Sequence, residues 1–234
     1  CGNAALIIAA QDSNVEVIKF IFKMFKGTID INKQDQNGDT AFILAAQNSN
    51  IKVLQFIFKM YKHIIDINKQ NNNGNTALLL AAQASSIDAI KIICETFKDN
   101  IDINKKNING DTVLIFALQD LNGRVFKYLF DTFKDKIDFN KQNEYGYTSL
   151  MFAAQTLNFD VIHYLSTTFK DKIDINKQNG YGNTALMIAA QCSCICSLFK
   201  DKTDIQKQYV NSYNKITNDI QQSKLYLSKQ KFFH

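Results

Sequence analysis

The residues whose side chains could do chemistry are few and are spread along the chain. The three histidines, His63, His163 and His234, lack the i, i+4 spacing that a metal site on a helix needs. No Ser/His/Asp or Cys/His arrangement for nucleophilic catalysis can be identified. Residues 180–182 read Gly-Tyr-Gly, without the third glycine of a nucleotide-binding fingerprint. The sequence therefore predicts no catalytic residue, no cofactor and no enzyme activity.

The cysteines form one cluster. Cys192, Cys194 and Cys196 place three thiols close together, where a thiolate metal site or a disulfide could form. Their spacing differs from the C-x-x-C of structural zinc, and no histidine or second cysteine pair supplies further ligands. We therefore expect reduced thiols and no metal ion, as is usual in the cytoplasm. A thiol- or metal-responsive element at this cluster is kept as an alternative.

The composition is that of a folded chain outside the membrane. Of its 234 residues, 46% are hydrophobic, and none of its apolar runs reaches the length of a membrane-spanning helix. The chain begins with Cys1 rather than Met, and no secretory signal follows. We expect a cytoplasmic protein, with the nucleus as the alternative location, and a chain that is a fragment of something longer.

The charge pattern argues against nucleic acid as a partner. The net charge is +5, and the segment from Tyr209 onward carries four Lys and one Asp, which leaves +2 for the rest of the chain. Lysines that recur every 36 residues from Lys33 to Lys177 follow by three positions a matching series of aspartates from Asp30 to Asp174. Because the two series largely neutralise each other, we expect a solvated lattice of charges rather than a nucleic-acid track.

Those series belong to a repeat that runs through the chain. Glycines recur at a constant interval of 36, at Gly2, Gly38, Gly74, Gly110, Gly146 and Gly182. Around them the same block returns, as Gly-Asp-Thr-Ala-Phe-Ile-Leu-Ala-Ala-Gln at 38–47 and Gly-Asn-Thr-Ala-Leu-Leu-Leu-Ala-Ala-Gln at 74–83. A second block, Ile-Asp-Ile-Asn-Lys-Gln at 173–178, recurs with the same period. The sequence therefore describes a linear array.

One repeat can be interpreted from its residues. Thr40 precedes an apolar run over 41–47 and is expected to cap that helix with its hydroxyl group. Polar residues 48–50 interrupt the run, and a second apolar helix is expected from Ile51 to about Tyr61. An alternating Ile-Asp-Ile segment and an Asn-Asn-Gly turn complete the repeat. Because a single repeat cannot bury its own apolar faces, the repeats must stack.

These blocks resemble the ankyrin repeat family, closely over about residues 2–191 and poorly over 192–208. The resemblance implies a mainly α fold: an ankyrin-like solenoid of stacked helix-turn-helix units with short β-hairpin-type turns. We expect an array over 1–208 and a basic tail over 209–234 that is able to form a capping helix. The first repeat should begin at its own turn, and the truncated last repeat should keep only a stub of its second helix, over 195–199.

The resemblance also implies a non-catalytic, monomeric scaffold that binds a partner protein. The expected surface is a concave groove formed by the turn tips and the exposed side of the first helices. Since a selective surface should differ between repeats, the candidate binding residues are those that vary. At the tips and on the first helices these are Tyr145, Tyr147, Tyr181, Glu144, Asn183, Asp111, Asp120 and Thr156.

Two alternatives stay open at this point. Tyrosine offers a large contact area at a low entropic cost, as in binding hot spots, but the three rings could instead pack over adjacent turns. The array could also be the regulatory or targeting segment of a larger enzyme or channel.

Overall fold

The computed structural model describes residues 2–25, 27–118, 120, 123–168 and 172–198. It forms two compact bodies, residues 1–149 and 150–234, which we call the N-terminal body and the C-terminal body. The tail expected over 209–234 lies outside the described residues. In the part of the chain that is described, no helix has the length and apolar character needed to cross a membrane.

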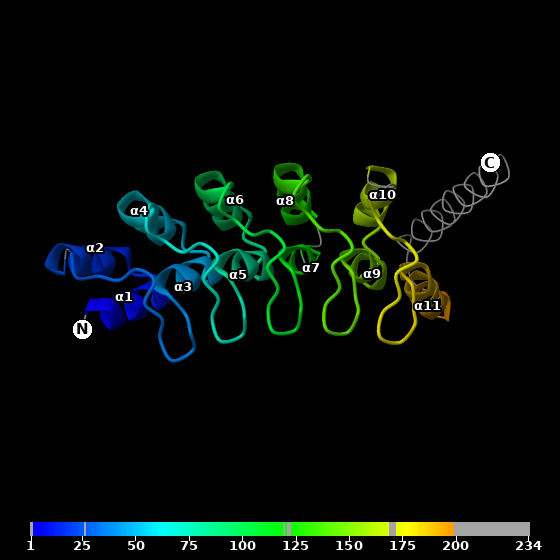
Figure 1. The fold of residues 1–234 in the computed structure, drawn as a ribbon, viewed down its shortest axis with the longest axis horizontal. Helices are drawn as coiled ribbons and strands as arrows, with labels where there is room; N and C mark the ends of the chain where they lie inside the picture. Colours follow the sequence, from blue (N-terminus) through cyan, green and yellow to red (C-terminus); the bar gives the residue numbers. More distant parts are fainter. Residues whose placement is uncertain (1, 26, 119, 121–122, 169–171, 199–234) are drawn as a thin grey trace. The chain divides into compact units, whose positions relative to one another are not determined.

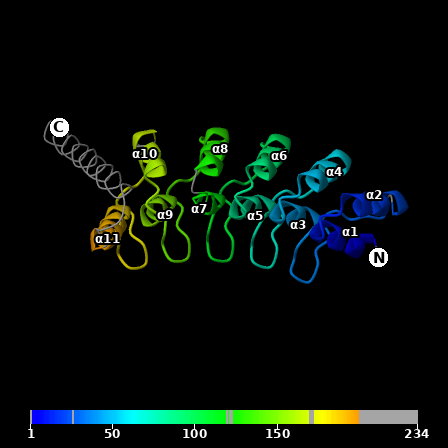
Figure 2. The same ribbon diagram turned by 180° about the vertical axis from the view of Figure 1, so that it is seen from behind.

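The N-terminal body is built from helix pairs. The first helices of its successive repeats lie in one row and the second helices in another, while the loops project away from the second helices (Figure 1; from behind in Figure 2). Each first helix packs against the first helix of the next repeat, and each also packs against its own second helix. The helices are α1 (Gly2–Gln11), α2 (Val15–Met24), α3 (Ala41–Gln47), α4 (Ile51–Tyr61), α5 (Ala77–Gln83), α6 (Ile87–Phe97), α7 (Val113–Ala117) and α8 (Arg124–Phe133).

Side-chain caps define where these helices begin. The hydroxyl oxygen of Thr40 accepts the Ile43 N–H at 3.1 Å, which confirms the predicted cap of α3. Asn50 caps α4 in the same way, because its Oδ1 accepts the Val53 N–H at 3.1 Å. Between the two helices, Ser49 adopts a positive φ of 53°, which turns the chain back on itself. Short polar residues thus define the helix boundaries, which the pattern of apolar residues alone does not determine.

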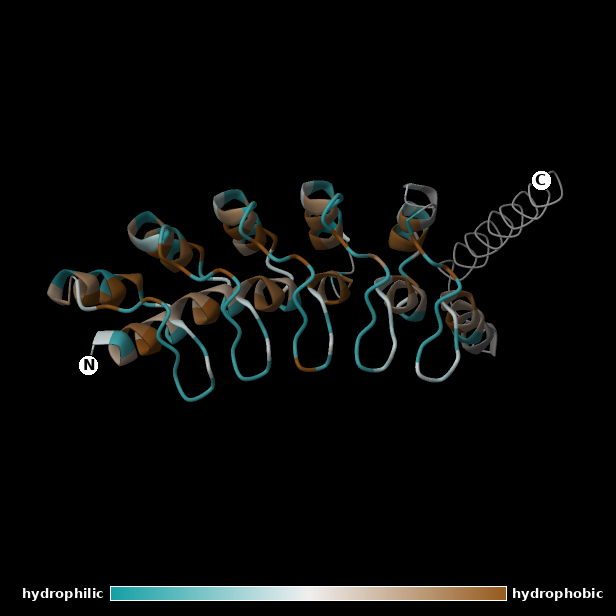
Figure 3. Ribbon diagram, viewed as in Figure 1, coloured by the Kyte–Doolittle hydropathy of each residue, from teal (hydrophilic) through white to brown (hydrophobic). Residues whose placement is uncertain are grey.

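The core lies between the two helix rows. Every residue of segments 41–46, 77–82 and 113–118 is buried, so the first helices are apolar all round (brown in Figure 3). Rings from the second helices fill the space beside them: the centroid of Phe58 lies 5.2 Å from that of Phe42 and 5.0 Å from that of Phe97. Along α3 and α5, only the last residues, Gln47 and Gln83, are exposed, so these helices offer less surface to a groove than expected.

The C-terminal body contains α9 (Ser149–Gln155, whose first residue ends the N-terminal body), α10 (Phe159–Thr168) and α11 (Ala185–Leu198). The expected stub helix is not separate, because α11 runs without interruption through Cys192 and Cys194.

One further expectation is corrected. Gly2 is the first residue of α1, so it does not lie in a turn. As expected for a mainly α solenoid, the loops carry turns and no β-strand among the residues that are described. What holds the loops in place is instead a set of side-chain and single backbone hydrogen bonds.

Candidate protein-binding surface

Each loop ends in a turn built around one Asx side chain. Oδ1 of Asp35 accepts the N–H groups of Asn37 and Asp39, both at 2.8 Å. Asn71, Asn107, Asn143 and Asn179 repeat this arrangement, with distances of 2.9–3.1 Å. The glycine within each turn, such as Gly38, has a positive φ of 72–77°. The chain therefore forms the same rigid turn five times.

Backbone hydrogen bonds connect the tips of neighbouring turns in the N-terminal body. An N–H group on each tip donates to a carbonyl oxygen on the preceding tip at 2.9–3.0 Å, in the pairs Asn72–Asn37, Ile108–Asn73 and Glu144–Asn109. The backbones approach so closely that a Cβ atom on Gly74 would lie 2.8 Å from the backbone nitrogen of Ile108. Four successive tips are thus locked to one another.

Side-chain amides join the same repeats below the tips. Nδ2 of Asn71 donates to Oδ1 of Asp39 at 2.8 Å. Asn68 links the backbone of the next repeat at two points, since its Oδ1 accepts the Asp102 N–H at 2.9 Å and its Nδ2 donates to the Asn100 carbonyl at 2.7 Å. Each link recurs in the neighbouring repeats. The amide-rich composition therefore serves to hold the repeats together.

Two large apolar side chains stand out on this polar row of tips. Ile108 is 62% exposed and Tyr145 is 59% exposed, while the tips at 36–37 and 72–73 carry only Gln and Asn. The hydrogen bond between Asn109 and Glu144 puts the two on adjacent tips. Figure 3 shows the loops in teal, with the tip between α6 and α7 in brown. We call Ile108 and Tyr145 the tip pair.

Comparison with known proteins decides the family. The family model described as "Ankyrin repeats (3 copies)" matches residues 1–65, 59–143, 95–179 and 133–209. The chain belongs to the ankyrin repeat family. A solved structure also matches this ankyrin chain: a predatory endopeptidase from Bdellovibrio bacteriovorus in complex with an immunity protein. The match has a TM-score of 0.67 and 28% sequence identity, and it covers 85% of this chain and 98% of the other. No curated protein matches the sequence.

The predicted binding residues of the ankyrin array fall into two groups. Glu144, Tyr145, Tyr147, Asp111 and Asp120 belong to the N-terminal body, whereas Tyr181, Asn183 and Thr156 belong to the C-terminal body. Side chains of Glu144, Tyr145, Tyr181 and Thr156 are exposed, and those of Tyr147, Asn183 and Asp111 are half-buried. The structure therefore places Tyr145 and Tyr147 on one loop of the array and Tyr181 on a loop of the other body.

Asp120 is not available to a partner. Its side chain is buried, and its Oδ2 accepts the Val125 N–H at 3.0 Å at the start of α8. The residue in the N-cap position of α8 is Gly123, which has no side chain to act as a cap. Asp120 therefore caps that helix from a distance, and its difference from the other repeats is structural.

Asp111 is also engaged within the array. Its Oδ1 accepts Nδ2 of Asn143 at 2.8 Å, so the carboxylate already has a partner in the next repeat. Ile108 is not among the binding residues predicted from the sequence, although the sequence distinguishes it, since the other repeats have Gln, Asn, Glu and Gly at its position.

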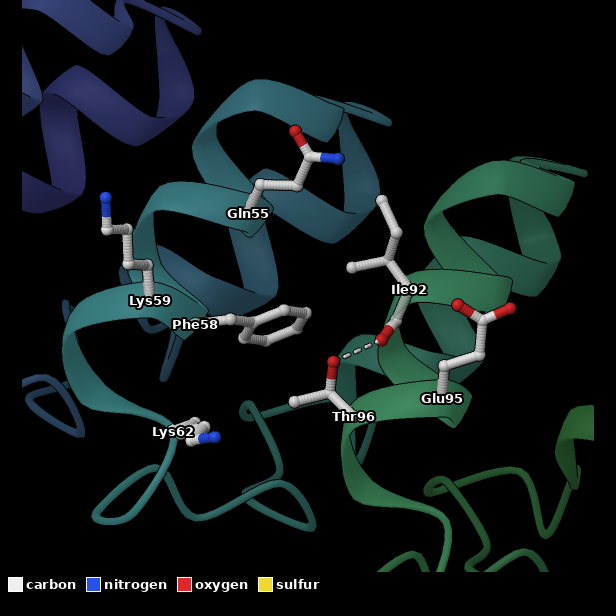
Figure 4. Close-up of a pocket in the computed structure, with 7 residues that line it drawn as sticks. All are labelled: Gln55, Phe58, Lys59, Lys62, Ile92, Glu95 and Thr96. Atoms are coloured by element: carbon white, nitrogen blue, oxygen red, sulfur yellow. Dashed lines mark hydrogen bonds between the residues drawn. The ribbon is translucent and has the colours of Figure 1, made fainter.

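A cleft of about 580 Å³ lies among the second helices of the N-terminal body, between α4 and α6 (Figure 4). The ring of Phe58 points into it, and Lys59, Lys62 and Glu95 surround it with charges of both signs. The hydroxyl group of Thr96 donates to the Ile92 carbonyl oxygen at 2.7 Å, so it is already engaged within α6. This lining is that of a solvated outer surface, and we assign it no chemistry.

The thiols present no reactive site among the described side chains. Burial, with a further contribution from Glu95, raises the pKa of Cys94 to about 12, so this thiol stays protonated. Cys192 is half-buried, and the side chains of Cys194 and Cys196 lie outside the described residues. Over the described part of the chain, no group of three or more His, Cys, Asp or Glu side chains is placed to hold a metal ion.

Proposed function

We propose that this ankyrin array is a non-catalytic scaffold whose partner protein docks on the turn tips around Ile108 and Tyr145. The observation that carries this proposal is the tip pair: two large apolar side chains, each more than half exposed, on adjacent tips that are otherwise polar. Exposed apolar side chains surrounded by polar ones are typical of protein interfaces, and tyrosine is enriched among their hot spots.

The rigidity of the tips supports this role. The backbone hydrogen bonds between tips and the repeated Asx turns hold both anchors in place before any partner arrives. A preorganised surface loses little conformational entropy on binding, so more of the contact energy remains as affinity. Because residues 41–46, 77–82 and 113–118 of the first helices are buried, the tips offer a partner more exposed side chains than those segments do.

The matched solved structure points to the same class of function. It is a complex of two proteins, an endopeptidase and an immunity protein, and ankyrin repeats generally act in protein–protein recognition. The surface we propose here comprises Ile108, Glu144 and Tyr145, with Tyr147 beside them. Tyr181, Asn183 and Thr156 are candidates for a separate contribution from the C-terminal body. The cytoplasm as the compartment and a monomeric state remain predictions from the sequence.

Affinity capture from a lysate of the native cells tests the proposal. We expect the wild-type chain to retain a partner protein, and the double variant Ile108→Ala/Tyr145→Ala to bind it at least about tenfold more weakly, since a hot-spot truncation typically costs more than 1 kcal/mol. The matched control is Gln36→Ala/Asn73→Ala, which removes side chains from the same two positions two repeats earlier. Circular dichroism checks that all three proteins are folded.

The possible outcomes distinguish the scaffold role of the protein from the location of its binding site. If both double variants keep wild-type affinity, the partner binds elsewhere and the tip pair is not the site. A wild-type chain that is folded and captures no protein would contradict the scaffold role itself. The single variant Tyr181→Ala then reports whether the C-terminal body adds to the affinity.

A further inference from the structure

The carboxyl ends of α2 and α4 combine exposed apolar side chains with lysines. Met24 and Met60, one period apart, are 60% and 47% exposed, and Ile64, in the turn after α4, is 58% exposed. The lysines around them are exposed as well. We call this set of side chains the lysine–methionine surface: Lys23, Met24, Lys59, Met60, Lys62 and Ile64.

The exposure of the apolar side chains does not come from a missing neighbour. The helix α4 packs against α2 on one side and against α6 on the other, and the three helices follow one another in the row of second helices (Figures 1 and 2). Met60 and Ile64 are exposed in spite of both neighbours. They therefore point away from the stacked array, where a partner can reach them.

The same positions are acidic or polar in the two repeats that follow. Glu95 and Asp131 stand where α2 and α4 have a lysine, and Thr96 and Thr132 stand where they have a methionine. Each threonine hydroxyl group donates to a carbonyl oxygen of its own helix at 2.7 Å. The fold of a repeat thus requires neither the lysine nor the methionine, so their presence in α2 and α4 is a property of the surface.

The balance of charge changes at the same boundary. Segments 15–28 and 51–64 together contain six lysines and one glutamate, whereas segments 87–100 and 123–136 contain six basic and five acidic residues. The single glutamate is paired with a lysine of its own helix at 2.7 Å. Within the described part of the chain, the three lysines of the lysine–methionine surface have no ion-pair partner. This surface is therefore locally positive, and it is complementary to a negatively charged ligand.

The size of the surface indicates what kind of ligand fits. Packed helices lie about 8–10 Å apart, so two neighbouring helices with their side chains span roughly 20 Å. Beyond α4 the surface ends at Glu95, which lies across the cleft from Lys59 and Lys62 (Figure 4). A helix of three to four turns is about 20 Å long. A flat bilayer extends further and would also meet the acidic residues of α6, which favours a short protein segment.

We propose that the lysine–methionine surface binds a short, acidic, amphipathic helix of a partner protein. The carboxylates of that helix pair with Lys23, Lys59 and Lys62, and its apolar side chains contact the methionines, whose unbranched side chains adapt to different partners. The surface lies on the row of second helices, and the loops that carry the tip pair project away from this row (Figure 1). It is thus a second site, independent of the tips.

A designed peptide serves as the probe. It is about 14 residues long and labelled with fluorescein, with leucines at the i, i+3, i+4, i+7 spacing of one helix face and glutamates elsewhere. Fluorescence anisotropy with the full chain should show saturable binding that weakens as salt is added. A peptide with serine in place of leucine, and one with lysine in place of glutamate, should each bind at least about tenfold more weakly.

Charge reversal tests where the peptide binds. Lys23→Glu/Lys59→Glu introduces an acidic residue where α6 and α8 already have one, so the fold should tolerate it, and the affinity should fall at least about tenfold. The matched control, Lys98→Glu/Lys134→Glu, changes the net charge of the chain by the same amount after α6 and α8 and should bind within about twofold of the wild type. Circular dichroism checks that each variant is folded.

A second pair of substitutions tests the apolar contact. Met24→Thr/Met60→Thr writes in the residue found at this position in α6 and α8, and the affinity should fall about threefold or more while its dependence on salt stays the same. The reverse change, Glu95→Lys/Thr96→Met, extends the surface onto α6 and should strengthen binding. Unchanged affinity in both variants would overturn the proposed contact.

The remaining outcomes decide between classes of ligand. A folded wild-type chain that does not bind the peptide, or equal losses in the two charge-reversal variants, would overturn the proposal. Vesicles of phosphatidylcholine with and without phosphatidylserine are tested in parallel. If the vesicles with phosphatidylserine bind the chain and the peptide does not, the surface belongs to a membrane instead. Ile108→Ala/Tyr145→Ala should leave peptide binding unchanged, and a loss there would move the peptide to the tips.

Discussion

The turns of the two bodies have the same hydrogen bonds within the loop. They differ in whether Nδ2 of the central Asn side chain has a hydrogen-bond partner. In the N-terminal body, Nδ2 of Asn71, Asn107 and Asn143 donates to an oxygen of a residue 32 positions earlier. In the C-terminal body, Oδ1 of Asn179 accepts the same two N–H groups as in the other turns. Its Nδ2, however, has no hydrogen-bond partner although the residue is only 6% exposed.

The two kinds of hydrogen bond need different residues. The turn depends only on residues of one loop, whereas each of the three intact links joins two repeats, with Asp39, Asn75 and Asp111 as the acceptors. A buried amide without a partner costs about 1–3 kcal/mol.

The largest expected effect concerns the glycines of the two bodies. Gly110 and Gly182 both have positive φ, 74° and 77°. A Cβ atom on Gly110 would lie 2.7 Å from the backbone nitrogen of Glu144, whereas one on Gly182 would meet nothing within 4 Å. Gly182→Ala should therefore cost only the strain of a left-handed backbone, about 1–2 kcal/mol. Gly110→Ala adds a backbone clash, for a total of about 3 kcal/mol.

Urea unfolding of the two glycine variants checks this prediction. Both must be compared with the wild-type chain at the same pH, with the change in the free energy of unfolding as the readout. Equal losses for the two variants would mean that the close approach of neighbouring loops in the N-terminal body contributes nothing beyond the turn itself.

The second prediction concerns the hydrogen bond between Asn143 and Asp111. Asp111→Ala leaves Nδ2 of the buried Asn143 without its acceptor, and we expect a loss of about 2 kcal/mol. Asp111→Asn is the matched control, because Asn75 already makes the equivalent link at 3.2 Å. The free energy of unfolding of both variants gives the result. If the Asn variant loses as much as the Ala variant, the hydrogen bond is not the cause.

How far the sequence predicts this structure depends on how many positions separate the interacting residues along the chain. The cap of α3 by Thr40 was predictable because donor and acceptor are three residues apart, and the glycine turns were predictable from their own loop. The links at a spacing of 32 residues were not, since no local pattern shows which amide meets which carboxylate. The same holds for Asp120, whose variation looked functional and proved to be a cap required by Gly123.

The candidate site was predictable only in part for a related reason. The exposure of Tyr145 follows from its place on a turn tip. That Ile108 and Tyr145 lie on adjacent tips depends on a hydrogen bond between Asn109 and Glu144, 35 positions apart. The burial of residues 41–46, 77–82 and 113–118 arises from stacking on neighbouring helices, which a single repeat does not reveal.

The smallest expected effect is a pH dependence at one link of the N-terminal body. Burial raises the pKa of Asp39 above its unfolded value of 3.8, and nearby Asp35 adds to this, while the hydrogen bond from Asn71 opposes it. The folded chain therefore holds this proton more tightly than the unfolded chain. As pH rises from the unfolded pKa through the raised one, stability is lost, and above that range the loss is constant.

Asp39→Asn isolates this contribution. The amide cannot titrate, and Asn75 shows that an Asn side chain can still accept the hydrogen bond at this position. The advantage of the variant over the wild type should therefore be absent near pH 3, grow as the pH rises and level off towards neutrality. Urea unfolding at pH 3, 5 and 7 would show it. An advantage that shrinks with rising pH would mean that the Asn71 hydrogen bond outweighs burial, and that the charged carboxylate strengthens this link between repeats.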